Sequence, residues 1–168
     1  MSCKRGDLPF FELHGRVRAV SWTGGSGLTS GQWDFAKDGK LECGTWEVES
    51  RDARGRIKSA VFTEVDRDSR EEFRAGLEFS LSRRGALVSA INRNDFGNYE
   101  YILARDGNGR VTELSLRDMA DSVYYIYNYS CYESDPKGNW TSRRFTVTCG
   151  GTVINSGEES RDIVYFDE

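Results

Sequence analysis

The stretch YNYSCYESDPKGNWTSRRF, residues 127–145, contains the clearest local structure in the chain. Tyr127 and Tyr129 are two residues apart, so their rings share one face of an extended strand. The sequence Asp-Pro-Lys-Gly-Asn follows at 135–139, where proline presets φ for a turn and glycine and asparagine tolerate the left-handed backbone of a tight corner. Trp140 then begins a second extended run. The stretch therefore predicts a strand, a tight corner and a second strand.

Four weaker versions of this pattern precede it, and each is an aromatic or apolar run that leads to a Gly-polar-apolar corner. The glycines of the five corners are Gly39, Gly55, Gly85, Gly109 and Gly138. Their spacings are 16, 30, 24 and 29 residues. A fixed period would predict a solenoid, whereas this drifting one predicts a degenerate array of hairpins.

These hairpins follow one another along most of the chain. Consecutive strands joined by short turns form an antiparallel meander. We therefore predict an all-β fold, a meander of consecutive antiparallel β-hairpins that forms one long, twisted or curled sheet, with a closed antiparallel β-barrel as the structural alternative. With 168 residues the chain suffices for one domain, at 10–168, after a flexible lead-in or tether at 1–9.

The patterns at both ends of this domain are less regular. Residues 10–13 and 17–21 alternate around Gly15, which predicts a first strand pair or one bent strand. Near the other end, residues 150–159 carry glycines and predict a loop that leads to a last strand at 161–166.

The last unit, residues 127–143, resembles the Y-x-Y-D-x-x-G-N-W-T-x-R form of the Rhs/YD repeat, most of all the short YD-repeat lipoproteins of Bacteroidetes. The matching residues are Tyr127, Tyr129, Asp135, Gly138, Asn139, Trp140, Thr141 and Arg143. The resemblance implies a non-enzymatic, exported repeat protein. It also implies a location in the periplasm or at the outer membrane and cell surface of a Gram-negative bacterium.

Composition argues against a nucleic-acid partner and against a membrane-spanning helix. The net charge of −4 and the pI near 5.2 argue against a nucleic-acid partner, which normally requires a basic patch or stripe. No stretch approaches the roughly 20 apolar residues of a membrane helix, so membrane contact is expected only through an N-terminal lipid anchor. Aromatic residues make up 12% of the chain, and we expect them to supply much of the buried area.

The four cysteines show no C-x-x-C pair and no metal-ligand spacing. The resemblance implies that Cys3 is a lipidation candidate, because members of the family are tethered by an N-terminal cysteine; the alternative is an incidental residue in a frayed terminus. In a simple hairpin that closes at 136–137, Cys131 would face Ser142 and not Cys149. For Cys43, Cys131 and Cys149 we therefore expect free buried thiols, and a Cys131–Cys149 disulfide only if the strand ends bend back.

The sequence contains no catalytic motif. His14 is its only histidine, and no nucleophile elbow, P-loop, dinucleotide fingerprint or zinc motif is present. A glycosidase-like pair of carboxylates would have to come from 27 acidic residues, and no motif selects two of them. We predict neither an enzymatic activity nor a bound metal or cofactor.

The aromatic rows carry the functional prediction. The candidate binding residues are Tyr125, Tyr127, Tyr129, Tyr132 and Trp140. Their rings either fill the core and pair across strands, or lie on an open face and stack on a sugar or on a partner protein. Residues 124–127, Tyr-Tyr-Ile-Tyr, place aromatic rings on both faces of one strand, of which an alternating sheet buries only one.

Together with the resemblance, these patterns predict a small exported interaction or scaffold module at the cell envelope, with a protein or glycan partner. They make no prediction of its oligomeric state. Two alternatives remain open. A carbohydrate-binding module needs two or more coplanar exposed rings, and a barrel that carries a small hydrophobic ligand needs an enclosed apolar cavity.

Overall fold

The computed structural model describes residues 6–24, 30–65, 68–94, 97–119 and 123–167. These residues form one antiparallel sheet of twelve strands and one 3-10 turn, η1, at Leu8–Phe11. The strands are β1 Val17–Thr23, β2 Gln32–Phe35, β3 Leu41–Cys43, β4 Glu47–Arg51, β5 Ile57–Val65, β6 Glu72–Leu81, β7 Leu87–Asn94, β8 Gly97–Arg105, β9 Val111–Asp118, β10 Val123–Ser134, β11 Trp140–Cys149 and β12 Thr152–Tyr165.

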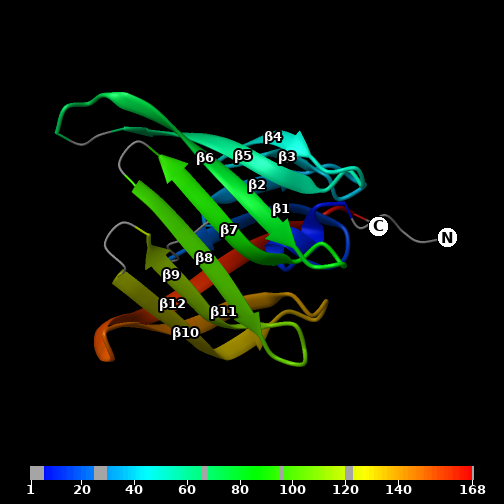
Figure 1. Cartoon of the computed structure of the whole chain (residues 1–168). Coiled ribbons are helices and arrows are strands. Elements are labelled where there is room, and N and C mark those ends of the chain that lie inside the picture. The colour runs from blue at the N-terminus through cyan, green and yellow to red at the C-terminus, as the bar shows by residue number, and fades with distance from the viewer. Residues whose placement is uncertain (1–5, 25–29, 66–67, 95–96, 120–122, 168) are drawn as a thin grey trace.

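The sheet curls until its two edges lie near each other (Figure 1). The strand order is β3-β2-β1-β12-β11-β10-β9-β8-β7-β6-β5-β4, so the first strand pairs with the last. Residues 44–46 join the two edge strands, β3 and β4, directly to each other. Because the sheet's two edges are linked in this way, the barrel is nearly closed. The structure confirms the predicted all-β meander of antiparallel hairpins. Of the two predicted shapes, an open curled sheet and a closed barrel, it is close to the barrel.

Five hairpins turn at one end of the barrel, the corner end, and all share one geometry. The first residue of each corner donates its N–H to the carbonyl of the fifth, and the glycine at the fourth position donates to the carbonyl of the first. In the last corner these bonds join Asp135 N to Asn139 O at 2.9 Å and Gly138 N to Asp135 O at 3.0 Å. All five corner glycines have φ between 78° and 90°, which side chains with a Cβ rarely adopt. The sequence therefore identified these corners correctly.

The segment that precedes β1 enters the barrel at the corner end and fills it (Figure 1). Phe10 and Phe11 of η1 are 3% and 0% exposed. The ring of Phe10 lies 4.9 Å from that of Phe79, and the ring of Phe11 lies 4.9 Å from that of Trp33, measured between centroids. We call residues 7–15 the plug, because its rings occupy the interior of this half of the barrel.

Two predictions for this segment are wrong. Residues 7–9 belong to the packed domain and not to a flexible lead-in at 1–9, since Leu8 is buried. Residues 10–13 form no strand, because Pro9 stands in the first turn of η1, where a fixed φ and a missing N–H favour a helical turn.

The predicted loop at 150–159 is also wrong, because β12 already begins at Thr152 and pairs with β11 along this stretch. Gly150 and Gly151 form the connection with φ of 58° and 80°. Two consecutive glycines supply the positive φ values that a two-residue hairpin loop requires. The last strand is therefore much longer than its apolar part suggests.

The three described cysteines are free, as predicted, but none of them is fully buried. Cys43 and Cys131 are exposed and Cys149 is half-buried. Ser142 pairs with Glu133 and not with Cys131, because β10 contains a bulge at which Cys131 takes a φ of 52°. The bulge shifts the register that a simple hairpin would have.

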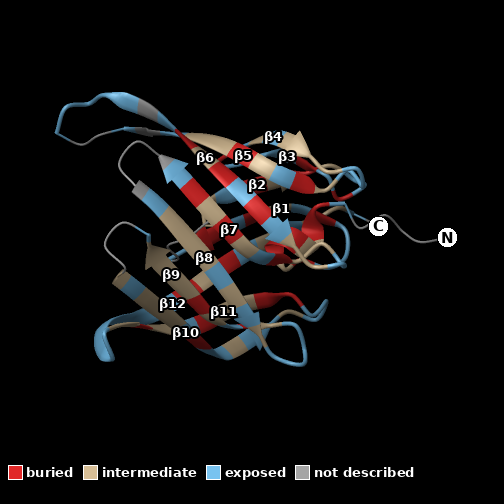
Figure 2. Ribbon diagram, viewed as in Figure 1, coloured by how far each residue is buried: buried red, intermediate tan, exposed pale blue. Residues whose placement is uncertain are grey.

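Figure 2 shows buried residues alternating along the strands, as expected for a sheet with one face turned inward. The larger hydrophobic cluster joins the plug to the inner faces of β1–β7 and to Trp140. A smaller cluster consists of Val111, Leu114 and Tyr129, with half-buried aromatic rings packed against it. The core is therefore dense at the corner end and looser under β8–β10.

Candidate functional site

Acidic side chains of the plug bind arginines that stand directly before two of the corners. Asp7 accepts a hydrogen bond from Arg51 at 2.9 Å and one from the backbone N–H of Leu41 at 2.8 Å. Glu12 accepts one from Arg105 at 3.1 Å. Both arginines also donate to the carbonyl of their own corner glycine. Both corners thus hold the plug through an arginine that bonds to an acidic side chain of the plug and to the carbonyl of the corner glycine.

Arg161 of β12 holds the other side of η1. Its Nη1 and Nη2 donate to the carbonyl oxygens of Phe11 and Glu12 at 2.9 and 2.8 Å, and its Nε donates to the carbonyl of Trp140. Its guanidinium also lies 4.0 Å from the ring centroid of Trp140. These bonds satisfy carbonyl groups that the end of a helical turn leaves without partners.

Arg143 of β11 forms the centre of a second buried group. Its guanidinium lies 3.8 Å from the ring centroid of Tyr129 and 4.3 Å from that of Trp140. Its Nε donates to the Glu159 carboxylate, and its Nη1 donates to the Tyr132 hydroxyl at 3.0 Å. A buried charge needs such a partner and such hydrogen bonds, and Arg143 has both.

Burial shifts the pKa values of Arg161, Glu159 and Tyr129. It lowers the pKa of Arg161 to about 10, and it raises the pKa of Glu159 and of Tyr129 above their usual values. Catalysis by an acid or a base requires a group that can reach the proton of a substrate. Arg161 and Glu159 are each 3% exposed and bonded to protein groups, so this cluster fastens the plug to the wall.

The described residues hold no group of three or more His, Cys, Asp or Glu that could bind a metal ion. The side chain of His14 is exposed, and its backbone is held by Asn139. The N–H of His14 donates to Asn139 Oδ1 at 2.7 Å, and its carbonyl accepts from Asn139 Nδ2 at 2.9 Å. His14 thus contributes to the plug through its backbone.

Three of the five predicted binding residues lie inside the barrel at this cluster. Tyr129 and Trp140 are 8% and 3% exposed, so their rings fill the core; that they bind a ligand stays a prediction. Tyr132 is half-buried, and its hydroxyl donates to the carbonyl of Val111 at 2.5 Å. The ring and the hydroxyl of Tyr132 therefore both contact other residues of the protein.

The other two, Tyr125 and Tyr127, lie on the same inner face of β10, closer to the end opposite the corners, the far end. The rings of Tyr127 and Tyr129 stack with 6.5 Å between centroids and 20° between planes, so the predicted shared face is confirmed. Tyr125 and Tyr127 point inward but are only half-buried. The lipidation candidate Cys3 lies outside the described residues.

Strand register places further inner-face side chains beside Tyr125. Tyr125 of β10 pairs with Leu116 of β9, and Leu116 pairs with Tyr101 of β8. Strands two positions apart are about 9–10 Å apart, so the two tyrosines stand on either side of the leucine. All three side chains are half-buried.

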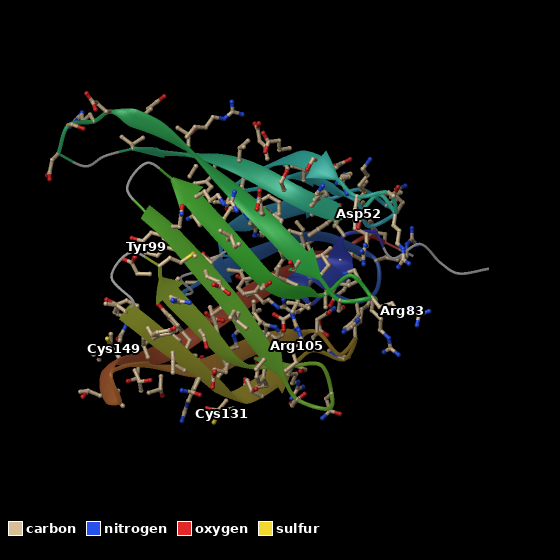
Figure 3. All side chains as sticks on the ribbon, viewed as in Figure 1. Asp52, Arg83, Tyr99, Arg105, Cys131 and Cys149 are labelled. Atoms are coloured by element: carbon tan, nitrogen blue, oxygen red, sulfur yellow. The ribbon has the colours of Figure 1, made fainter. Side chains whose placement is uncertain are left out.

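A polar row lies one step closer to the far end. Asp118 of β9 pairs with Tyr99 of β8, and Tyr99 pairs with Asn92 of β7. Figure 3 shows Tyr99 at the far end, with Arg105 and the Asp52 corner at the opposite end. We call the two rows together the far-end inner face; it consists of Asn92, Tyr99, Tyr101, Leu116, Asp118 and Tyr125.

Asn92 was not singled out by the sequence. It is 7% exposed, and its Oδ1 has no hydrogen-bond partner. A buried acceptor left unpaired costs about 1–3 kcal/mol, so this atom is suited to a donor supplied from outside the chain. A feature of the sequence could have pointed to Asn92. It stands two residues after Ala90, so it shares the inner face of β7, where the other buried side chains are apolar.

The outer surface carries a separate polar groove of about 460 Å³ over β4–β8. Serine hydroxyls and charged side chains dominate its lining, which includes Ser50, Ser59, Ser80, Ser89, Lys58, Glu78 and Glu100. Ser50 and Ser59 hydrogen-bond to each other at 2.5 Å. A groove of this kind can form hydrogen bonds but offers no aromatic platform.

Among the described aromatic side chains, Tyr124 is the one that is exposed and not merely half-buried, at 49%. It lies on the outer face of β10, with the Arg117 guanidinium 5.4 Å from its ring centroid. A carbohydrate platform built from two or more coplanar exposed rings is therefore not formed by the described residues.

Comparison of the chain with protein-family models, with curated proteins and with solved structures finds no match. The Rhs/YD resemblance thus stays a prediction from the sequence. Within the described part of the chain, no helix has the length and apolar character needed to span a membrane.

Proposed function

We propose that the protein is a non-enzymatic, exported binding module that takes a small ligand at the far-end inner face. The observation that carries this proposal is a difference in burial within one barrel. The inner-face side chains of Phe79, Leu87 and Val111 near the corners are buried, whereas Tyr99, Tyr101, Leu116 and Tyr125 face inward and keep partial exposure. Aromatic and apolar side chains with a few polar groups are typical of small-ligand sites.

The plug supports this proposal by making one end of the barrel rigid. Asp7, Glu12 and the backbone of η1 are bonded to four separate strands, β3, β4, β8 and β12. Of these strands, β8 also carries Tyr99 and Tyr101 of the proposed site, and a site that keeps its geometry without a ligand lowers the cost of binding. In this proposal the ligand lies on a half-exposed inner face of the barrel.

We retain Cys3 as the proposed anchor to the outer membrane. The described chain enters the barrel at the corner end, so an anchor at Cys3 would turn the far end away from the membrane. Expression in a Gram-negative host with labelled palmitate tests this. The wild type should take up label in the membrane fraction and Cys3→Ser should not; equal labelling of both would exclude the anchor.

A second candidate function is that of a scaffold that binds a protein through the outer groove. The groove of about 460 Å³ with its serine hydroxyls favours it. Ser80→Arg would place a large side chain in the groove without touching the inner face. It should abolish capture of an envelope partner if the groove binds one, and should leave ligand binding inside the barrel unchanged.

The proposed site is tested with N-phenyl-1-naphthylamine, an uncharged fluorophore that brightens on apolar surfaces. Neighbouring tyrosines provide matched variants, because Tyr125 faces inward and Tyr124 faces outward on the same strand. Tyr125→Ser should weaken fluorophore binding about fivefold or more, by loss of buried aromatic area, while Tyr124→Ser should not. Absence of binding to the wild type, or equal loss in both variants, would overturn the proposal.

A further inference from the structure

We infer that two copies of the chain associate through the outer face of β8–β12 and form a symmetric dimer. The inference goes beyond the proposed function, because such a dimer uses the outer face and leaves the far-end inner face open. Three observations carry it: an apolar row on the outer face, two opposite charges that flank this row, and the symmetry that brings these charges together.

The first observation is a row of side chains that crosses the outer face of five strands. In-register pairing places its members side by side from β8 to β12: Ile102, Ser115, Ile126, Thr148 and Val153. We call them the outer row. Its two ends, Ile102 and Val153, are 48% and 59% exposed, and Tyr124 beside it is 49% exposed. Neighbouring strands lie about 4.8 Å apart, so the row is about 19 Å long. Contiguous exposed apolar side chains with a polar rim are typical of an interaction surface.

The second observation is a pair of opposite charges on β9. Glu113 stands two residues before Ser115 and Arg117 two residues after it, so both charges share the outer face and flank the outer row on opposite sides. Four residues of extended strand span about 13 Å. Glu113 and Arg117 are therefore too far apart to form an ion pair within one chain.

Neither charge forms an ion pair with any other residue that the structure describes. Glu113 accepts a hydrogen bond from Ser115 Oγ at 3.2 Å, and the guanidinium of Arg117 lies against the ring of Tyr124. Arg117 Nε is buried and has no hydrogen-bond partner. Glu100 lies beside Arg117 in the ladder of β8 and β9, but the two side chains form no ion pair. The two charges are thus available to a partner.

The third observation is that a two-fold axis along the outer row pairs these charges between copies. Such an axis places β9 of one copy antiparallel to β9 of the other, with Ser115 opposite Ser115. Arg117 of each copy then lies opposite Glu113 of the other, which gives two identical ion pairs at the edges of an apolar contact. An interface of this kind is isologous, as in the cyclic dimers that dominate soluble oligomers. Two sheets that pack face to face also keep their strands nearly aligned. A second copy therefore fits both the apolar row and its flanking charges.

Sedimentation velocity of the whole protein tests the dimer, and charge reversal tests its geometry. The wild type should show a monomer–dimer equilibrium at micromolar concentrations, since this patch belongs to the smaller class of interfaces. Glu113→Arg and Arg117→Glu should each weaken the dimer about tenfold or more, because each places like charges opposite each other. An equimolar mixture of the two variants should restore it, because the reversed charge of one variant then faces the reversed charge of the other.

Arg18→Glu and Glu47→Arg provide matched controls, because they make the same changes of charge at exposed positions on β1 and β4. Each should dimerise like the wild type, and mixing them should add nothing. A wild type that stays monomeric throughout the micromolar range overturns the inference. So does a dimer that persists in both outer-row variants, that their mixture fails to restore, or that the controls weaken equally. Circular dichroism of each variant establishes that it is folded.

Discussion

The guanidinium of Arg161 donates a hydrogen bond to the carbonyl oxygen of Glu12 at 2.8 Å, across 149 residues of sequence. This contact joins the last strand to the plug. Within the residues that the structure describes, no carboxylate is bonded to Arg161, which donates to the carbonyls of Phe11, Glu12 and Trp140. Arg161 therefore donates several hydrogen bonds to backbone carbonyls, two of them in the plug.

Arg161→Met should lower the free energy of unfolding by about 3 kcal/mol, because it leaves buried carbonyl groups without donors. Urea denaturation followed by tryptophan fluorescence measures the change. Arg144→Met is the control, since Arg144 is exposed on the outer face of the neighbouring strand and should cost less than about 0.5 kcal/mol. Equal losses in the two variants would contradict the role given to Arg161.

The corner at 106–110 contains two glycines with different backbone conformations. Gly109 has a φ of 82°, whereas Gly107 does not lie in the left-handed region, and an added Cβ would meet nothing within 4 Å at either position. Gly109→Ala should therefore cost about 1–2 kcal/mol through backbone strain, and Gly107→Ala should gain up to about 1 kcal/mol by restricting the unfolded chain. Thermal denaturation of the pair checks this, and a loss in both would contradict it.

The corners could be predicted from sequence because their information is local. In the corners at 52–56, 106–110 and 135–139, an aspartate at the first position accepts N–H groups two and four residues later, and the glycine takes the positive φ. Each corner is specified by residues that are neighbours in the sequence. The antiparallel meander then follows from a chain of such corners.

The sequence could not decide between an open sheet and a closed barrel and did not indicate the plug, because both depend on contacts between distant residues. Gly44 links the two edge strands, and a Cβ there would lie 1.9 Å from the ring of Trp33, so only glycine allows the indole beneath this connection. The plug is fixed by Arg161, far away in the sequence.

Cys131 provides a test of the bulge in β10. Its side chain is exposed and its φ is 52°, a conformation that asparagine adopts far more readily than a β-branched residue. Cys131→Asn should leave stability equal or slightly higher, and Cys131→Val should cost about 1–2 kcal/mol. Equal urea midpoints for the two variants would argue against the bulge. A thiol reagent should label Cys131 in the folded wild type.

Tyr165 makes the stability of the last corner depend on pH. Its hydroxyl donates to the Asp135 carboxylate and accepts from Asn139 Nδ2 at 2.7 Å. Burial and the bond to Asp135 raise the pKa of Tyr165 to about 12, above its usual value of 10.0. The unfolded chain thus loses this proton first, so the stabilisation is complete below pH 10 and is lost as the pH rises toward 12.

Tyr165→Phe should accordingly be less stable than the wild type by about 1 kcal/mol at pH 8, the value of one lost hydrogen bond. Its free energy of unfolding should fall less steeply between pH 10 and pH 12, and the two curves should converge there. Tyr124→Phe, at an exposed outer-face position, should follow the wild type throughout. Urea denaturation at a series of alkaline pH values measures all three. Parallel curves for Tyr165→Phe and the wild type would show that the phenol of Tyr165 is not coupled to folding.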